Sequence, residues 1–318
     1  MISPPAALAA ELAALAGEVG SARLTAAVDR LGSAYRADGV PGGALRDVDA
    51  AAYGVYRMPA TYAALRAALG QLAAADPSFA PRSVVDLGAG TGAALWAVAD
   101  LWPSISSLHA VEQDPAMTEV GRRLAAAGAL PDVDWQAGSV VAAALPAADL
   151  VIAGYALGEL DAPDRDGVLA AVAADTVVVV EPGTPRGFTN VLAARGALIE
   201  SGRSVAAPCP HSDACPMAGS DWCHFAVRLP RSAAQRRAKG GELGYEDEKF
   251  SFVAASRRPV TPAAGRILRH PQRRTGHVGL RLCGADRATS DVIVSKRNKE
   301  LYRSARKADW GDEWPPRP

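Results

Sequence analysis

An acid and three glycines lie together where a β-branched run meets an alanine-rich segment. The stretch contains, in order, Asp86, Leu87, Gly88, Ala89, Gly90, Thr91 and Gly92. Glycine adopts positive φ readily and lets the backbone approach a ligand, and the start of a helix offers unpaired N–H groups. The pattern predicts a strand, a ligand-binding loop and a helix in succession, with Asp86, Gly88, Ala89, Gly90 and Gly92 at the ligand.

The position of Asp86 indicates the charge of that ligand. A carboxylate two residues before the first glycine repels a pyrophosphate, whereas it attracts the sulfonium and ammonium groups of S-adenosylmethionine. A second acid, Glu112, follows the next expected strand, residues 108–111, where a carboxylate can accept both hydroxyls of a ribose. Together these residues resemble the adenosylmethionine-binding motifs of class I methyltransferases. The alternative is a tight strand-to-helix turn with the acids there by chance.

Strands and helices alternate from residue 83 onward, which predicts an α/β fold. The expected strands are residues 84–87, 108–111, 133–137, 149–153 and 176–180. This alternation favours a parallel, Rossmann-like sheet covered by helices on both faces, with ligands at the carboxyl ends of its strands. We therefore add Gln113, Ser139 and Gly154 to the predicted cofactor site.

The segment after the fourth strand supplies the candidates for catalysis, Tyr155 and Glu159. Class I methyltransferases place residues here that face the transferred methyl group. The segment lacks the Asn/Asp-Pro-Pro-aromatic sequence that orients an exocyclic amine, so methylation of an adenine amine is disfavoured. Glu159 is a candidate base, or else a charge that favours the start of a helix.

All four cysteines lie beyond the alternating part of the chain, at Cys209, Cys215, Cys223 and Cys283. Three of them fall within fifteen residues rich in Pro and Gly, which favours metal coordination in a reducing compartment over disulfides. Four thiolates suit a [4Fe–4S] cluster. Zinc remains an alternative, held by all four thiolates or with His211 or His224 in place of one. A further alternative is four free buried cysteines.

The charge of the chain is segregated, although its net charge is zero. Residues 1–227 hold 13 Lys and Arg against 24 Asp and Glu, whereas residues 228–307 hold 20 against 7. A basic segment attached to an acidic body indicates a polyanionic partner, most simply RNA, with no DNA expected. The alternative is a solvated basic face that folds back on the acidic body.

Length and patterning divide the chain of 318 residues into three parts. We expect an N-terminal helical domain at 1–80, an S-adenosylmethionine-binding domain at 81–205, and at 206–318 a cysteine segment with a basic β-hairpin and tail that complete the sheet. The expected hairpin pairs residues 277–283 with 291–295. No apolar run reaches membrane-spanning length and the first residues lack a basic leader, so we expect a cytoplasmic protein without a membrane partner.

The cysteine segment gives the most specific resemblance. Residues 208–232 contain Cys-Pro-His, Cys-Pro, Trp-Cys-His-Phe and Arg-Leu-Pro-Arg-Ser. With the glycine loop, Leu157-Gly158-Glu159-Leu160 and Glu181-Pro182-Gly183, they resemble the ribosomal small-subunit methyltransferase-like family over about residues 50–314. That resemblance implies binding of S-adenosylmethionine, a [4Fe–4S] cluster on the four cysteines, and action in maturation of the small ribosomal subunit.

Two functions from different classes follow. The first is a small-subunit assembly factor with a methyltransferase fold that uses the cluster to shape an RNA surface; the second is an active rRNA methyltransferase with a structural cluster or zinc. Either one needs cations for the phosphates of the RNA. The predicted RNA-binding residues are Arg236, Arg237, Arg269, Arg273, Arg274, Lys296, Arg297 and Lys299.

Overall fold

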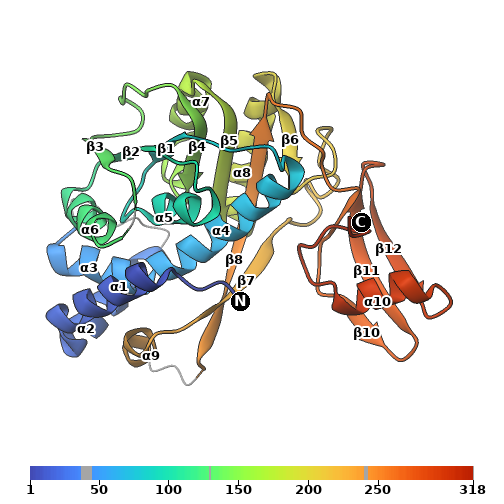
Figure 1. Ribbon diagram of the computed structural model, residues 1–318, viewed down its shortest axis with the longest axis horizontal. Helices are drawn as coiled ribbons and strands as arrows, with labels where there is room; N and C mark the ends of the chain where they lie inside the picture. The colour runs from blue at the N-terminus through green and yellow to red at the C-terminus, as the bar shows by residue number, and fades with distance from the viewer. Residues whose placement is uncertain (37–44, 129, 240–242, 318) are drawn as a thin grey trace.

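The fold is built on one large mixed sheet, seen in the computed structural model in Figure 1. The structure describes residues 1–36, 45–128, 130–239 and 243–317. The strand order is β3-β2-β1-β4-β5-β8-β6, and β7 pairs with the free half of β8. The strands are β1 (Ser83–Leu87), β2 (Ser107–Glu112), β3 (Val133–Ala137), β4 (Ala148–Gly154), β5 (Ala174–Pro182), β6 (Ser204–Ala207), β7 (Phe225–Pro230) and β8 (Tyr245–Ser256).

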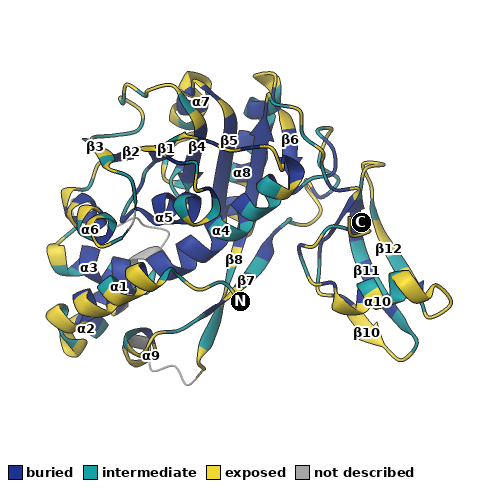
Figure 2. Ribbon diagram, in the orientation of Figure 1, coloured by how far each residue is buried: buried dark blue, intermediate teal, exposed yellow. Residues whose placement is uncertain are grey.

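The first five strands are parallel, and β8 runs antiparallel to β5. Their apolar runs are buried on both faces because helices cover both sides of the sheet, as Figure 2 shows for the central strands. Val84 faces one core and Val85 the other. The α/β fold and each of the five predicted parallel strands are thereby confirmed.

Side chains cap the starts of several helices that follow the strands. Asp114 accepts hydrogen bonds from the amides of Ala116 and Met117 at the start of α6, and Thr184 accepts one from Gly187 at the start of α8. The helices of this part are α5 (Ala93–Leu101), α6 (Pro115–Ala126), the 3-10 turn η1 (Leu157–Glu159), α7 (Ala162–Ala171) and α8 (Pro185–Glu200).

The N-terminal helices share a hydrophobic core with the sheet. Leu8, Leu24 and Leu69 belong to the same buried cluster as Val84 on β1 and Phe252 on β8. The sequence pattern changes near residue 80, but the N-terminal helices and the sheet share one hydrophobic core across that boundary. These helices are α1 (Ala6–Val19), α2 (Ser21–Arg36), α3 (Asp47–Tyr56) and α4 (Met58–Ala75).

The last part of the chain forms a second, smaller sheet with its own core. The predicted hairpin is present as β11 (His277–Gly284) and β12 (Thr289–Ser295), but it does not complete the large sheet. It joins β9 (Gly265–Ile267) and β10 (Gln272–Arg274) instead, and α10 (Lys299–Lys307) packs on it. Its buried face carries Val278, Leu280 and Leu282 at alternating positions. The large sheet is completed by β6, β7 and β8.

A long arm extends from the large sheet. The first half of β8 pairs with β7, and the two strands leave the sheet toward α9 (Ala233–Lys239), as Figure 1 shows. The arm with α9 reaches the lower edge of that view, and the second sheet lies at its right. Among the helices described, none combines the length and the apolar composition needed to cross a membrane.

Candidate functional site

The glycine loop joins the end of β1 to the start of α5, as predicted. Gly88 has φ +69°, and a Cβ there would lie 2.6 Å from the Cβ of Ala156, so only glycine fits. Gly90 has φ +55°, and its amide donates a hydrogen bond to Oε2 of Glu112 at 2.7 Å. The loop thus holds the backbone close against the segment after β4.

Asp86 lies buried below this loop with an unsatisfied oxygen. Its side chain is 2% exposed, and its Oδ2 atom has no hydrogen-bond partner among the described residues. Burial, with a smaller contribution from the nearby charge of Glu112, raises the pKa of Asp86 to about 8. A buried carboxyl without a donor is a place where a cationic or hydrogen-bond-donating ligand is favoured.

Glu112 ends β2, next to β1, and both of its oxygens are used. Oε2 accepts from the Gly90 amide, and Oε1 accepts from the Asp114 amide at 2.8 Å. Burial raises the pKa of Glu112, and the two backbone donors oppose that rise. In this structure the acid therefore orders the loop and the start of α6.

The pocket beside the loop brings together part of the predicted cofactor set. Asp86, Gly88, Ala89 and Gly90 line it with Gly154 at the end of β4. Gly92 caps α5, Gln113 is exposed, and the hydroxyl of Ser139 accepts from the Val141 amide; these three and Glu112 do not line this pocket. Four residues of α3 and α4 also line it, which sequence reasoning missed: Tyr53, Met58, Thr61 and Leu65. Only the helical pattern of these segments was visible in the sequence.

Tyr155, a candidate for catalysis, is held in a half-buried network. Its hydroxyl donates to Oε1 of Glu248 on β8 at 3.0 Å, and Arg57 donates to both oxygens of the same carboxylate at 2.9 and 3.1 Å. Burial and the charge of Glu248 raise the pKa of Tyr155 well above its usual value. The phenol is therefore a donor at neutral pH and not a base. Glu159 is exposed on the turn η1, whose first residue, Leu157, is buried.

A second network, also missed, supports that turn. Glu181 at the end of β5 accepts a hydrogen bond from the Gly158 amide at 3.0 Å. Its side chain is buried, and burial raises its pKa to about 7. A Cβ at residue 158 would lie 2.5 Å from Oε2 of Glu181, which explains the glycine. Both residues belong to motifs that the sequence singled out without a role for them.

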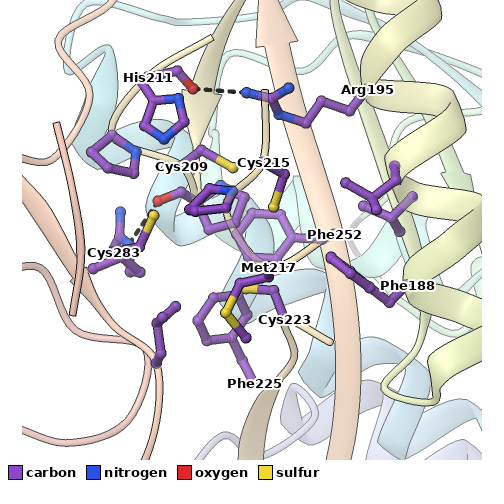
Figure 3. A pocket seen from close by; sticks show the side chains of 17 residues that line it. Phe188, Arg195, Cys209, His211, Cys215, Met217, Cys223, Phe225, Phe252 and Cys283 are labelled. Carbon is purple, nitrogen blue, oxygen red and sulfur yellow. Dashed lines mark hydrogen bonds between the residues drawn. The ribbon is translucent and has the colours of Figure 1, made fainter. Parts of the chain in front are cut away.

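The four cysteines line one cavity, as Figure 3 shows. Cys209, Cys215 and Cys223 lie on the segment between β6 and β7, and Cys283 lies on β11 of the second sheet. The cavity has otherwise mostly apolar walls that include Phe188 of α8. The structure therefore brings together four thiols, of which the first and the last are 74 positions apart in the sequence. We call this space the four-thiol cavity.

Burial raises the pKa of three of the thiols, Cys209, Cys223 and Cys283. Burial raises the pKa of Cys209, and the positive charges of Arg195 and Arg266 oppose that rise. Burial also raises the pKa of Cys223 well above its usual range, and raises that of Cys283 to about 12 with contributions from Cys209 and Cys215. A metal bound here must displace the protons of these thiols.

The arrangement of the metal-ligating side chains bears on whether they could hold a single metal ion or a metal cluster. Across the described part of the chain, no three or more His, Cys, Asp or Glu side chains are gathered as one metal ion requires. His224 stacks on Trp222, and His211 lines the cavity with both ring nitrogens lacking a partner among the described residues. A [4Fe–4S] cube binds each of its four thiolates on a different iron, whereas zinc draws all of its ligands to one ion.

The predicted RNA-binding residues fall into two groups. Arg236 and Arg237 are exposed on α9, at the end of the arm. On or near the second sheet, Arg274, Lys296, Arg297 and Lys299 are exposed. Two others contact the protein itself: Arg269 pairs with Asp221 at 2.5 Å, and Arg273 donates to the carbonyls of Arg306 and Ala308 at the end of α10.

The strand order with a reversed β8, together with the glycine loop after β1, defines a class I methyltransferase fold. The chain belongs to the family described as mitochondrial small ribosomal subunit Rsm22, which matches residues 47–315. The family expected from the sequence is thereby confirmed.

Three similar proteins give the range of the likeness. Human METTL17, described as a mitochondrial ribosome assembly protein, is 28% identical over 286 residues, which are 83% of this chain and 62% of the relative. Rsm22-cox11 tandem protein 2 of Schizosaccharomyces pombe, also mitochondrial, is 23% identical and covers 85% of this chain and 44% of its own. This chain thus spans less than two thirds of either relative. The magnesium protoporphyrin IX methyltransferase of Synechocystis, solved with bound S-adenosylmethionine, covers 71% of this chain and 90% of its own at 13% identity and a TM-score of 0.41.

Proposed function

We propose that this protein is an assembly factor that binds the RNA of the immature small ribosomal subunit. The match of residues 47–315 to a small-subunit family carries the proposal. The human relative's description as a ribosome assembly protein supports it. Assembly in the cytoplasm remains a prediction from the sequence, since both curated relatives are described as mitochondrial.

The glycine loop is the proposed seat of S-adenosylmethionine. The unsatisfied Oδ2 of Asp86 supports this, because it lies buried beside the loop and favours a positively charged or donating ligand. Gly88, Ala89, Gly90, Gly92 and Gly154 would let the ligand approach the backbone, with Glu112, Gln113 and Ser139 at the neighbouring strand ends. When bound, S-adenosylmethionine supplies an electrophilic methyl group. Whether that group is transferred or only orders the fold separates the two functions.

The four-thiol cavity is the proposed seat of a [4Fe–4S] cluster on Cys209, Cys215, Cys223 and Cys283. The donor set supports this, because four thiols line one mostly apolar cavity with no acid among its lining residues. A cluster held there would join the large sheet to the second sheet through Cys283. The basic second sheet would then have one orientation toward RNA.

RNA would be held through its phosphates. The exposed cations of the second sheet and its flanks, Arg274, Lys296, Arg297 and Lys299, have the charge and the accessibility that phosphate contacts need. Arg236 and Arg237 on α9 would add a second contact region. Arg269 and Arg273 would have to exchange their protein contacts for RNA, so we expect them to contribute less.

The alternative is an active rRNA methyltransferase, which the pocket beside the glycine loop favours. The hydrogen bond from Tyr155 to Glu248 weighs against Tyr155 as a base, because the phenol already donates its proton to that carboxylate. The pocket itself remains compatible with methyl transfer to RNA by an acceptor that needs no base from Tyr155.

One experiment separates the two functions. Metal-replete protein is mixed with immature small-subunit particles and S-adenosylmethionine labelled in its methyl group, and both binding and transfer are measured. Tight binding without transferred label is the result that the assembly-factor proposal expects. Label in rRNA that disappears in Asp86→Asn would establish the methyltransferase instead, and failure to bind the particles would overturn both.

A further inference from the structure

Two arginines beside the four-thiol cavity have no acidic partner within ion-pair distance. Arg195 of α8 is 7% exposed and Arg266 of β9 is 6% exposed, and both line the cavity. Neither forms an ion pair with any residue that the structure describes. The charges of Glu313 and Asp312 act on Arg266 from beyond ion-pair distance, and burial nevertheless lowers its pKa. An anion in the cavity would stabilise both guanidinium groups.

The hydrogen bonds of these arginines leave part of this charge unsatisfied. Arg195 donates through Nη2 to the carbonyls of His211 at 3.0 Å and Asp213 at 2.6 Å, but its buried Nε has no acceptor among the described residues. Arg266 donates to the carbonyls of Pro208 at 2.9 Å and Gly311 at 3.0 Å. Carbonyl oxygens satisfy N–H groups but carry no net negative charge.

Another buried arginine of this chain shows what a purely structural role looks like. Arg203 is 3% exposed and donates to the carbonyls of Val172, Ala174 and Asp175, with its Nε accepted by Asp175. Arg203 does not line the four-thiol cavity. Arg195 differs in both respects, because its Nε is unpaired and it lies beside the thiols.

We propose that Arg195 and Arg266 are the counter-ions of the group held by the four cysteines, and that they set its reduction potential. The inference rests on the proposed cluster. Four thiolates around a [4Fe–4S] core carry a net charge of about −2 when oxidised and about −3 when reduced. No carboxylate lines the cavity in the described chain, so the two guanidinium groups are its only lining charges of fixed sign. They therefore favour the more negative, reduced state.

The two arginines act from opposite sides of the joint between the sheets. Arg195 comes from a helix that covers the large sheet, whereas Arg266 comes from the second sheet and ties it to Pro208 and Gly311. Charge compensation is therefore complete only when the second sheet is docked. For this reason, binding of the cluster and docking of the second sheet would favour each other.

The test is the reduction potential of the cluster in full-length protein purified without oxygen, titrated with dithionite and followed in the visible spectrum. In Arg195→Gln and Arg266→Gln we expect the ratio of reduced to oxidised cluster at a fixed potential to fall about tenfold, which is about 59 mV for one electron. Arg195→Lys and Arg266→Lys keep the charge and should stay within about threefold of the wild type. Arg203→Gln is the matched control for loss of a buried arginine and should leave the ratio unchanged.

Iron content, measured on the same samples, shows whether a variant has lost the cluster or has only changed its reduction potential. Loss of the cluster in a glutamine variant and its retention in the lysine variant of the same residue would also support the proposal. Equal behaviour of the Gln and Lys variants, or potentials unchanged in both Gln variants, would overturn it and leave the arginines as hydrogen-bonding supports. A wild-type protein without iron and sulfide would instead sink the proposed cluster itself.

Discussion

At the scale of single residues, the cofactor seat depends on an acid that is held neutral. Asp86 is buried and has a pKa of about 8, against an ordinary value of 3.8. The folded chain therefore binds a proton that the unfolded chain releases between these two values. Folding stability should fall as pH rises through this window, by up to about 1.4 kcal/mol per pH unit.

The variant Asp86→Asn should remove this dependence. In the absence of ligand, we expect the unfolding free energy of the variant minus that of the wild type to increase as pH rises from about 5 to 8. The wild type loses stability over this range, whereas asparagine has no proton to lose. Chemical denaturation at both pH values measures the difference. An unchanged difference would mean that Asp86 is already ionised in the folded protein.

Binding of S-adenosylmethionine should show the opposite trend. The cationic ligand favours ionised Asp86, so the affinity of the wild type should increase with pH up to about 8 and then level off. Asp86→Asn should bind at least about tenfold more weakly and without this trend. Calorimetric titration at three pH values tests the prediction, which a pH-independent affinity in the wild type would refute.

Gly88 gives a prediction from shape alone. Gly88→Ala would place a methyl group 2.6 Å from the Cβ of Ala156 at a backbone φ of +69°. We expect a loss of about 1–3 kcal/mol in unfolding free energy and loss of ligand binding, measured by denaturation and titration. Gly196→Ala is the matched control, since nothing lies within 4 Å of a Cβ there. Equal effects of the two substitutions would contradict the close approach of loop and β4.

At the scale of elements, β8 contacts parts of the molecule that lie far apart in the sequence. Glu248 on β8 accepts two hydrogen bonds from Arg57, between α3 and α4, and one from Tyr155, after β4. The network therefore fixes the N-terminal helices against the strand ends. Glu248→Gln should lower the unfolding free energy by about 1–2 kcal/mol, because it leaves a half-buried guanidinium, 30% exposed, without its counter-ion.

Tyr155→Phe is the milder companion of that substitution. It removes one hydrogen bond and keeps the ion pair, so a loss of about 1 kcal/mol is expected. Urea denaturation measures both variants. If Tyr155→Phe were the more harmful of the two, the carboxylate would not be the centre of the network.

Local pattern predicted the parallel strands almost to the residue, and physical reasons explain where it failed. The run 176–180 is β-branched and lies inside β5, and residues 133–137 coincide with β3. The placement of β11 and β12 in a separate sheet depends on which strand they pair with, and alternation alone does not specify a partner. The lining of the cofactor pocket by Tyr53 and Leu65 was hidden because a buried helix face has the same pattern whatever it covers.

The candidate sites were predictable to different degrees. The four cysteines were singled out by their types and spacing, and they meet in one cavity. Arg195 gave no signal, and Arg266 was interpreted as a surface cation suited to phosphate contacts, because a single arginine in an amphipathic helix or a short strand has the pattern of a surface residue. Their burial is a property of the tertiary structure.

At the scale of the whole molecule, segregated charge should govern the partner. The triple variant Arg274→Gln, Lys296→Gln, Arg297→Gln removes exposed cations of the second sheet, so RNA affinity should fall and the slope of log affinity against log salt should shrink by about 2–3. Removing Arg23, Arg122 and Arg186 from the acidic body is the matched control. Filter binding over a salt series measures both, and equal effects would indicate nonspecific attraction.

The second sheet and the large sheet meet at the four-thiol cavity, so occupancy of that cavity is the central claim. Iron and acid-labile sulfide content, with the visible spectrum, of full-length protein purified without oxygen test it most directly. The account predicts about four irons and four sulfides per chain, lost together in Cys283→Ser. Stoichiometric zinc without sulfide, or no metal at all, would contradict it.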